Sequence, residues 1–413
     1  MNYLYPLLCL VLFFTSCKEN KIYNNEKAER TVIIYISAEN NLSNIAIDDI
    51  TEMVEGSKNM PANTNFIAFV DLADKTNPPY VLRFENGKSQ IDTDITFNED
   101  FYASDPNMMH DVLSRIILKY PAESYGLVLW GHANGWFVEN NSIDFNKGGK
   151  RRAYGGDTGN NTNYNAGKYW MNIPDMAKCL ERLPIKFDYI FADCCNFQCI
   201  EVAYELRNSA DYIIGSPAEI PGNGAPYDKL LPCLLNTNEL YYKNIVDVYY
   251  NHYYQKESSN YPNVDIGVPL SVISTKNISA LASATKNISH ELFSNEINID
   301  NAIYYYKNWT CKIMFDAKSL ILNNFSVQEG VASWLNALDR TVIYKKRCSS
   351  WDTMLSISFS DFNVTNDNYG GISMFIPLEI YDTKFMEYNQ KISNLQWYYD
   401  SGMNEYYNKN NNL

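Results

Sequence analysis

The chain has 413 residues, of which 46% are hydrophobic and 20% are charged, and it carries a net charge of −14. A surface with this excess of acids repels phosphates, so the charge argues against a nucleic-acid-binding protein. The length exceeds the ~250–300 residues at which a single hydrophobic core stops growing, so we expect two domains or lobes.

Residues 1–17 have the pattern of an export signal. The apolar run Leu7–Phe14 is long enough for a signal-peptide core and too short to span a bilayer. It ends at Ser16-Cys17, and a small residue before a cysteine is what a lipoprotein signal peptidase accepts. We therefore expect an exported bacterial lipoprotein, anchored in a membrane through Cys17 at the periplasm or cell surface, with residues 18–28 as a polar tether. A plain secretory leader or a short buried helix are the alternatives.

Residues 30 to about 240 alternate between strand and helix patterns. The expected strands are short, apolar, β-branched runs at 31–37, 66–72, 80–85, 125–130, 187–193 and 212–215. The expected helices carry apolar residues at helical spacing and lie at 45–55, 104–119, 173–183 and 201–207. The alternation predicts an α/β fold, with a mostly parallel sheet and helices on both of its faces.

Residues 241–413 have a different pattern. They contain a tyrosine-rich helix, a strand near 268–274, helices near 278–293 and a late strand at 371–376. We interpret this part as a C-terminal accessory lobe of the α+β type, packed on a domain that spans 29–240. The Asn-rich end at 408–412 is expected to be disordered.

Two of the expected strands are followed by residues that could take part in catalysis. The strand at 125–130 runs into a glycine-flanked His132, and the strand at 187–193 runs into Cys194-Cys195. The carboxyl ends of parallel strands meet at one edge of a sheet, so both loops should lie there. A cysteine peptidase needs a thiolate, a histidine that moves a proton and amide donors for the oxyanion. We also expect the helix after Cys195 to lower the pKa of its thiol.

Each of these residues alone has a structural explanation. His132 could be a loop histidine whose hydrogen bonds only stabilise the fold, and Cys195 could be a small buried apolar residue. Successive side chains of a strand point to opposite faces, so only one of Cys194 and Cys195 can face a cleft. The other three histidines fall in predicted helices. The shared sheet edge favours His132 and Cys195 as a catalytic pair.

These segments resemble the clostripain family, whose catalytic domain is similar to those of caspases, gingipains and legumains. Thr31–Leu42 resembles the family's opening strand and Asn-Asn-Leu turn, Trp130–Trp136 its histidine loop, and Asp193–Leu206 its cysteine loop and helix. The resemblance covers most of residues 31–230 and recurs weakly near 371–377. Counting back six residues from Glu201 places the nucleophile at Cys195.

The resemblance implies a caspase-like sheet and an endopeptidase that cleaves after Arg or Lys through a Cys195–His132 dyad. Backbone amides at Cys195 and Ala133 would form the oxyanion hole. Asp193 would pair with the basic substrate side chain, and Asn223 would stand in the pocket wall. Ala133 and Asn223 depart from the family pattern, which has Gly and an acid there. A helix cap is the alternative role for Asp193.

A polar segment between His132 and the helix at 173–183 contains Lys150, Arg151 and Arg152. Related peptidases are often activated by a cut in this region, so we expect a zymogen that cleaves itself at one of these residues. Plain solvated charge is the alternative.

We expect no metal and no cofactor. No CxxC pairs with another CxxC, which argues against zinc. Some family members need calcium, but the chain offers only the acidic segment 92–100, where Phe97 replaces the glycine of an EF-hand.

The expected partners are protein or peptide substrates with Arg or Lys, together with the membrane. The alternative function is a non-catalytic surface lipoprotein, a degenerate peptidase. It would bind a protein or glycan ligand through an aromatic surface built from some of its 33 Tyr, 19 Phe and 7 Trp.

Overall fold

The structure is a computed structural model that describes residues 26–74, 77–138, 153–159, 169–258, 261–294, 297–308, 311–326, 328–352, 359–382 and 387–405. The predicted signal peptide with Cys17, most of the tether, the processing residues Lys150, Arg151 and Arg152, and the Asn-rich end lie outside these ranges. Within them, no helix has the length and apolar character needed to cross a membrane.

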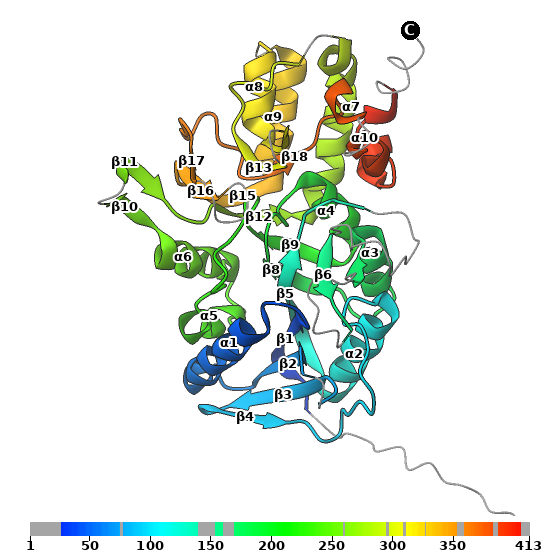
Figure 1. The fold of residues 1–413 in the computed structure, drawn as a ribbon, viewed down its shortest axis with the longest axis vertical. Coiled ribbons are helices and arrows are strands. Elements are labelled where there is room, and N and C mark those ends of the chain that lie inside the picture. The colour runs from blue at the N-terminus through cyan, green and yellow to red at the C-terminus, as the bar shows by residue number, and fades with distance from the viewer. Residues whose placement is uncertain are drawn as a thin grey trace, which may run out of the picture.

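A large sheet forms the centre of the molecule, with strands in the order β15-β12-β9-β8-β5-β1-β2-β3-β4 (Figure 1). Its strands are β1 (Ala28–Ala38), β2 (Thr64–Leu72), β3 (Tyr80–Glu85), β4 (Lys88–Ile91), β5 (Ala122–Ala133), β8 (Phe187–Asp193), β9 (Ala210–Gly215), β12 (Leu270–Ser274) and β15 (Val342–Lys346). The short strands β6 (Tyr154–Asp157) and β7 (Tyr169–Met171) extend from β5. Strands β2, β1, β5, β8 and β9 are parallel, and antiparallel strands flank them on both sides.

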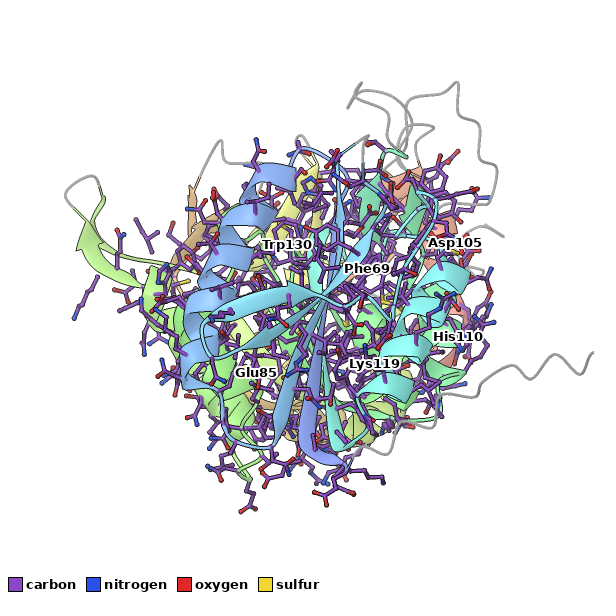
Figure 2. All side chains as sticks on the ribbon, turned by 90° about the horizontal axis from the view of Figure 1, so that it is seen from below. Phe69, Glu85, Asp105, His110, Lys119 and Trp130 are labelled. Carbon is purple, nitrogen blue, oxygen red and sulfur yellow. The ribbon has the colours of Figure 1, made fainter. Side chains whose placement is uncertain are left out.

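Helices cover both faces of this sheet, as the sequence predicts. One face carries α1 (Ser43–Gly56), α5 (Tyr227–Leu234) and α6 (Tyr241–Tyr253), and the other carries α2 (Pro106–Lys119), α3 (Ile173–Glu181) and α4 (Ile200–Glu205). Figure 2 shows α1 and α2 on opposite sides of the strands, with Trp130 toward α1 and Phe69 toward α2. Side chains alternate along each strand, so β1 contributes Ile34 to one core and Ile33 to the other.

The remaining elements form the upper part of the molecule in Figure 1. The helices are α7 (Ile278–Ser294), α8 (Ala317–Asn324), α9 (Glu329–Thr341), α10 (Tyr388–Ile392) and α11 (Gln396–Asp400). One small sheet contains β10 (Gln255–Ser258), β11 (Tyr261–Ile266), β16 (Ser350–Asp352) and β17 (Phe359–Asp361), and the other contains β13 (Tyr304–Asn308), β14 (Cys311–Asp316) and β18 (Ser373–Met374).

The central sheet does not end at the boundary of residue 240 that we drew from the sequence. Strands β12 and β15 lie beyond that residue, yet they pair next to β9 and complete the sheet. They cover the edge of β9, whose backbone donors and acceptors would otherwise be open to pairing with another chain. The accessory part and the catalytic part therefore share one sheet.

Candidate active site

The histidine and cysteine loops leave the same edge of the sheet. Strands β5 and β8 are parallel neighbours in which Trp130 pairs with Asp193, and His132 and Cys195 each follow two residues later. Neighbouring strands lie about 4.8 Å apart, so the register brings the two loops together. They also touch, because a Cβ on Gly135 would lie 2.7 Å from the carbonyl oxygen of Asn196.

The imidazole of His132 is held by Asn41. The His132 Nε2 atom lies 2.9 Å from Oδ1 of Asn41, in the turn that follows β1. An amide oxygen accepts a hydrogen bond, so this contact selects the tautomer with the proton on Nε2 and the lone pair on Nδ1. Asn40 stabilises the turn, since its Oδ1 accepts from the Leu42 amide at 2.9 Å. The sequence analysis assigned Asn41 only to the turn, because 91 residues separate it from His132.

Strand β6 supports the histidine loop from the other side. Its residues Gly155 and Tyr154 pair with His132 and Ala133. The buried hydroxyl of Tyr154 donates to the carbonyl oxygens of Trp130 at 3.0 Å and Tyr35 at 3.1 Å. Ala133 is not among the described non-glycine residues with positive φ, so its Cβ causes no backbone strain.

The two adjacent cysteines occupy different environments. Cys194 is 1% exposed and belongs to the hydrophobic core, whereas Cys195 is partly exposed. The Ile220 amide donates to the Cys195 sulfur at 3.5 Å. Asn196 then takes the left-handed conformation, with φ of 56°, and its amide donates to the Ala218 oxygen at 2.9 Å. Of the two thiols, only Cys195 can receive a substrate without unpacking the core.

One expectation about Cys195 is wrong. Helix α4 begins at Ile200, five residues after the cysteine, so its N-terminus does not act on the sulfur. Instead, burial raises the pKa of the Cys195 thiol to about 12, and the charges of Glu219 and Asp193 add to this rise. The resting thiol is therefore protonated, and a base must remove its proton before it can react.

The Asp193 carboxylate organises the loop before α5. Its Oδ2 accepts from the Ala225 amide at 3.0 Å and the Tyr227 hydroxyl at 2.8 Å, while Oδ1 accepts from the Tyr249 hydroxyl at 3.2 Å. These bonds run to α5, α6 and the preceding loop, so Asp193 does not cap the turn that follows it. Burial raises the pKa of Asp193 to about 6.

A second carboxylate, Asp49 on α1, faces the same point. A Cβ on Gly224 would lie 2.9 Å from Oδ2 of Asp193 and 3.1 Å from Oδ2 of Asp49, so these two oxygens lie within about 6 Å of each other. The Asp49 Oδ2 accepts from Nε1 of Trp130 at 2.7 Å. Burial raises the pKa of Asp49 to about 8, and the Asp193 charge contributes to the rise.

The sequence analysis missed Asp49, although a local signal was present. Asp49 lies on the face of α1 that also buries Ala46 and Met53, where an apolar residue is expected. Asn223, which we assigned to the pocket wall, is exposed in the same loop, next to Gly224.

The acidic segment considered for calcium is neutralised by the chain itself. The ammonium of Lys119 contacts Asp92 and lies 3.0 Å from Oδ2 of Asp94, and the Tyr120 hydroxyl donates to Asp92 at 2.5 Å. A cation at Asp92 and Asp94 would have to displace Lys119.

Comparisons with known proteins identify the family of the chain. The profile of the clostripain family, peptidase family C11, matches residues 34–411. Clostripain of Hathewaya histolytica is 28% identical over 237 residues, which are 52% of this chain and 43% of clostripain, so the match spans less than half of that relative.

Two solved structures cover nearly the same length as this chain. A secreted C11 cysteine protease from Bacteroides thetaiotaomicron, in complex with an irreversible peptide inhibitor, is 30% identical; the match covers 91% of this chain and 99% of that one, with a TM-score of 0.73. An inactive zymogen C11 protease from Parabacteroides distasonis, 23% identical with the same coverage and a TM-score of 0.72, shares the fold. The chain belongs to the clostripain family of cysteine peptidases.

Proposed function

We propose that this chain is an endopeptidase that cleaves after Arg or Lys, with Cys195 as nucleophile and His132 as base. The observation that carries the proposal is the packing of the two loops at one sheet edge, with Cys195 partly exposed and Cys194 buried.

The chemistry follows from the protonation states. Nδ1 of His132 takes the Cys195 proton, and the sulfur attacks the carbonyl carbon of the substrate. The amides of Cys195 and Ala133 stabilise the oxyanion. The C–N bond then breaks, and the imidazolium gives its proton to the leaving amine. Water then loses a proton to His132 and attacks the acyl carbon, the carbon–sulfur bond breaks, and the imidazolium of His132 returns its proton to the thiolate.

Asp193 and Asp49 together would supply the negative charge that recognises the basic side chain. Both carboxylates are buried next to Gly224, and no Lys or Arg is among the causes of their pKa shifts. A substrate guanidinium near this point would pair with them and bring their pKa values down.

We also propose that the chain matures by self-cleavage and that a lipid on Cys17 attaches it to a membrane. The described residue Ala153 directly follows Arg152, and its carbonyl accepts from the Asn134 amide at 2.9 Å. The basic residues therefore connect to a segment bound to the histidine loop.

The alternative of a non-catalytic binding module has no support from the surface. The largest fully buried side chains include Trp136, Trp334, Trp351 and Trp397. Among the described residues, Tyr399 is the one aromatic side chain that counts as a large exposed hydrophobic residue.

Substitutions of the two adjacent cysteines should have different effects on activity. Cys195→Ala and His132→Ala should each abolish peptide hydrolysis without loss of folding, since the members of one catalytic unit are not additive. Cys194→Ala should keep activity and lower the melting temperature, because it leaves a small cavity in the core. The reverse result for the two cysteines would place the nucleophile one residue earlier.

Asn41 should act as a positioning residue for His132. Asn41→Ala should lower kcat by about 10- to 100-fold with little change in KM, because a misoriented base loses near-attack geometry. Asn41→Asp keeps an acceptor for Nε2 and should restore most of the activity, with a pH profile shifted upward by the added charge. An unchanged kcat in Asn41→Ala would remove Asn41 from the mechanism.

Asp193 and Asp49 should determine the preference for a basic residue before the cut bond. We compare kcat/KM for matched peptides with Arg or its neutral isostere citrulline before the cut bond. Asp193→Asn and Asp49→Asn should each lower the Arg/citrulline ratio by about 10- to 100-fold, the value of one charged hydrogen bond. Asp48→Asn, an exposed neighbour on α1, is the matched control. An equal loss for both peptides would make the two acids purely structural.

The same ratio should depend on pH. Asp193 and Asp49 are uncharged below pKa values of about 6 and 8, so attraction for Arg should strengthen as the pH rises through both values. Taking the ratio cancels the pH effects that act on both peptides alike. Asp49→Asn should remove the rise near pH 8 and keep the rise near pH 6.

Self-cleavage should depend on Cys195. Intact mass should show a cut after Lys150, Arg151 or Arg152 in the wild type and none in Cys195→Ala. A conversion rate that does not change with dilution would mark an intramolecular cut. Full activity of the uncut wild type would rule out the zymogen.

A further inference from the structure

A short segment of the accessory part lies against the cysteine loop. Residues 371–377 resemble the family weakly in sequence, and no step of the proposed mechanism involves them. The amide of Ser373 donates to the carbonyl oxygen of Gln198 at 3.1 Å, and Ser373 forms a parallel bridge with Cys199. Gln198 and Cys199 belong to the loop that follows Cys195. The small sheet β13-β14-β18 thus extends its pairing onto this loop.

The side chain of Glu201 continues this pairing at the point where α4 begins. In a parallel ladder, the amide of Phe375 would donate to the carbonyl oxygen of Ile200, two residues after Gln198. Ile200 is already the first residue of α4, and a carbonyl there accepts from the helix amide four residues later. Glu201 supplies the acceptor instead, because its Oε1 accepts from the Phe375 amide at 2.7 Å.

Phe375 also contacts the histidine loop. Its ring centroid lies 4.6 Å from that of Trp136, and both side chains are fully buried. Beside Trp136, a Cβ on Gly135 would lie 2.7 Å from the carbonyl oxygen of Asn196 and 2.8 Å from Cε of Met314 on β14. The two catalytic loops and β14 are therefore in close contact here. Phe375 contacts the histidine loop through its ring and α4 through its amide.

The burial of Glu201 costs free energy. The residue is 0% exposed, and its Oε2 has no hydrogen-bond partner among the described residues. Burial raises the pKa of Glu201 to about 8, although the bond from Phe375 acts in the opposite direction. An apolar residue would avoid this cost, and such local costs are typical of functional sites. What the carboxyl group contributes at this position is the bond to Phe375.

We propose that Glu201 is a positioning residue of the peptidase reaction, which holds the cysteine loop against the histidine loop through Phe375. The proposal rests on Cys195 as the nucleophile. Glu201 lies six residues after Cys195, and the loop between them is held on its other side by two backbone bonds to residues 216–218. Loss of the Glu201 bond would loosen the loop, so that the sulfur no longer stays in place relative to the imidazole of His132.

The test measures kinetics and thiol reactivity in variants of the full chain. Glu201→Ala should lower kcat by about 10- to 100-fold with little change in KM, because the nucleophile loses its near-attack geometry while the substrate pocket is kept. Alkylation of Cys195 by iodoacetamide, followed by mass spectrometry of the peptide that contains it, should slow by a similar factor, without any substrate present. Glu201→Gln keeps an Oε1 acceptor for the Phe375 amide and should restore most of both rates.

Glu205 offers the matched control on the same helix. It lies four residues after Glu201 and is 2% exposed, and its Oε1 accepts from the amide of Gln396 on α11 at 2.5 Å. Glu205→Ala also removes a buried bond between α4 and the accessory part, so it should lower the melting temperature about as much as Glu201→Ala. It should nevertheless keep kcat and the alkylation rate of Cys195, because its bond runs away from both catalytic loops.

Glu201→Asp withdraws the carboxyl group by one methylene. It should show a smaller loss of kcat, and it covers the case in which Glu201→Ala does not fold. Equal losses of kcat in the Glu201 variants and Glu205→Ala, or an unchanged kcat in whichever Glu201 variant folds, would overturn the inference and leave Glu201 as a packing residue. Hydrolysis that persists in Cys195→Ala would overturn both this inference and the nucleophile on which it rests.

Discussion

The parallel pairing of β5 with β8 is the constraint on which the site depends. Because Trp130 pairs with Asp193, the loops that follow β5 and β8 begin at the same level of the sheet. A shift of this pairing by one residue would turn every side chain of β8 to the other face of the sheet. That shift would exchange Cys194 and Cys195 between core and cleft. The register is protected because both faces of β8 are buried: Ile190 packs in one core and Phe191 in the other. The hydrophobic pattern of the strand thus determines which thiol is reactive.

The same edge collects buried negative charge. Asp49 and Asp193 lie on one side of the histidine loop, and Glu39, Asp71 and Asp157 lie on the other. At the opposite end of β1, by contrast, Arg30 is fully paired, with Asp188, the Ser124 hydroxyl and the ring of Tyr241 as partners. Buried acids at this edge lower stability, and such local cost is typical of functional sites.

The sequence predicted the features that depend on local pattern and missed those that depend on contacts across the chain. Six strands, β1, β2, β3, β5, β8 and β9, and the helices α1 to α4 follow from apolar periodicity, and the shared sheet edge follows from their alternation. Strand β12 was assigned to another lobe and β15 was not predicted as a strand, because pairing with distant strands has no signature in their own residues. Asn41 and the acid cluster were missed for the same reason. The error about α4 was local: the four residues 196–199 separate Cys195 from the helix, and the pattern Glu201 to Arg207 does not reveal this distance.

The two groups of acids differ in their surroundings. The Asp193 and Asp49 pair lies next to a loop that is exposed at Asn223. The Glu39, Asp71 and Asp157 cluster is buried, and its last member ends the strand β6 that pairs with His132. The basic substrate side chain that we propose would therefore meet the first group, where release must follow each turnover, while the second group stays enclosed by the fold.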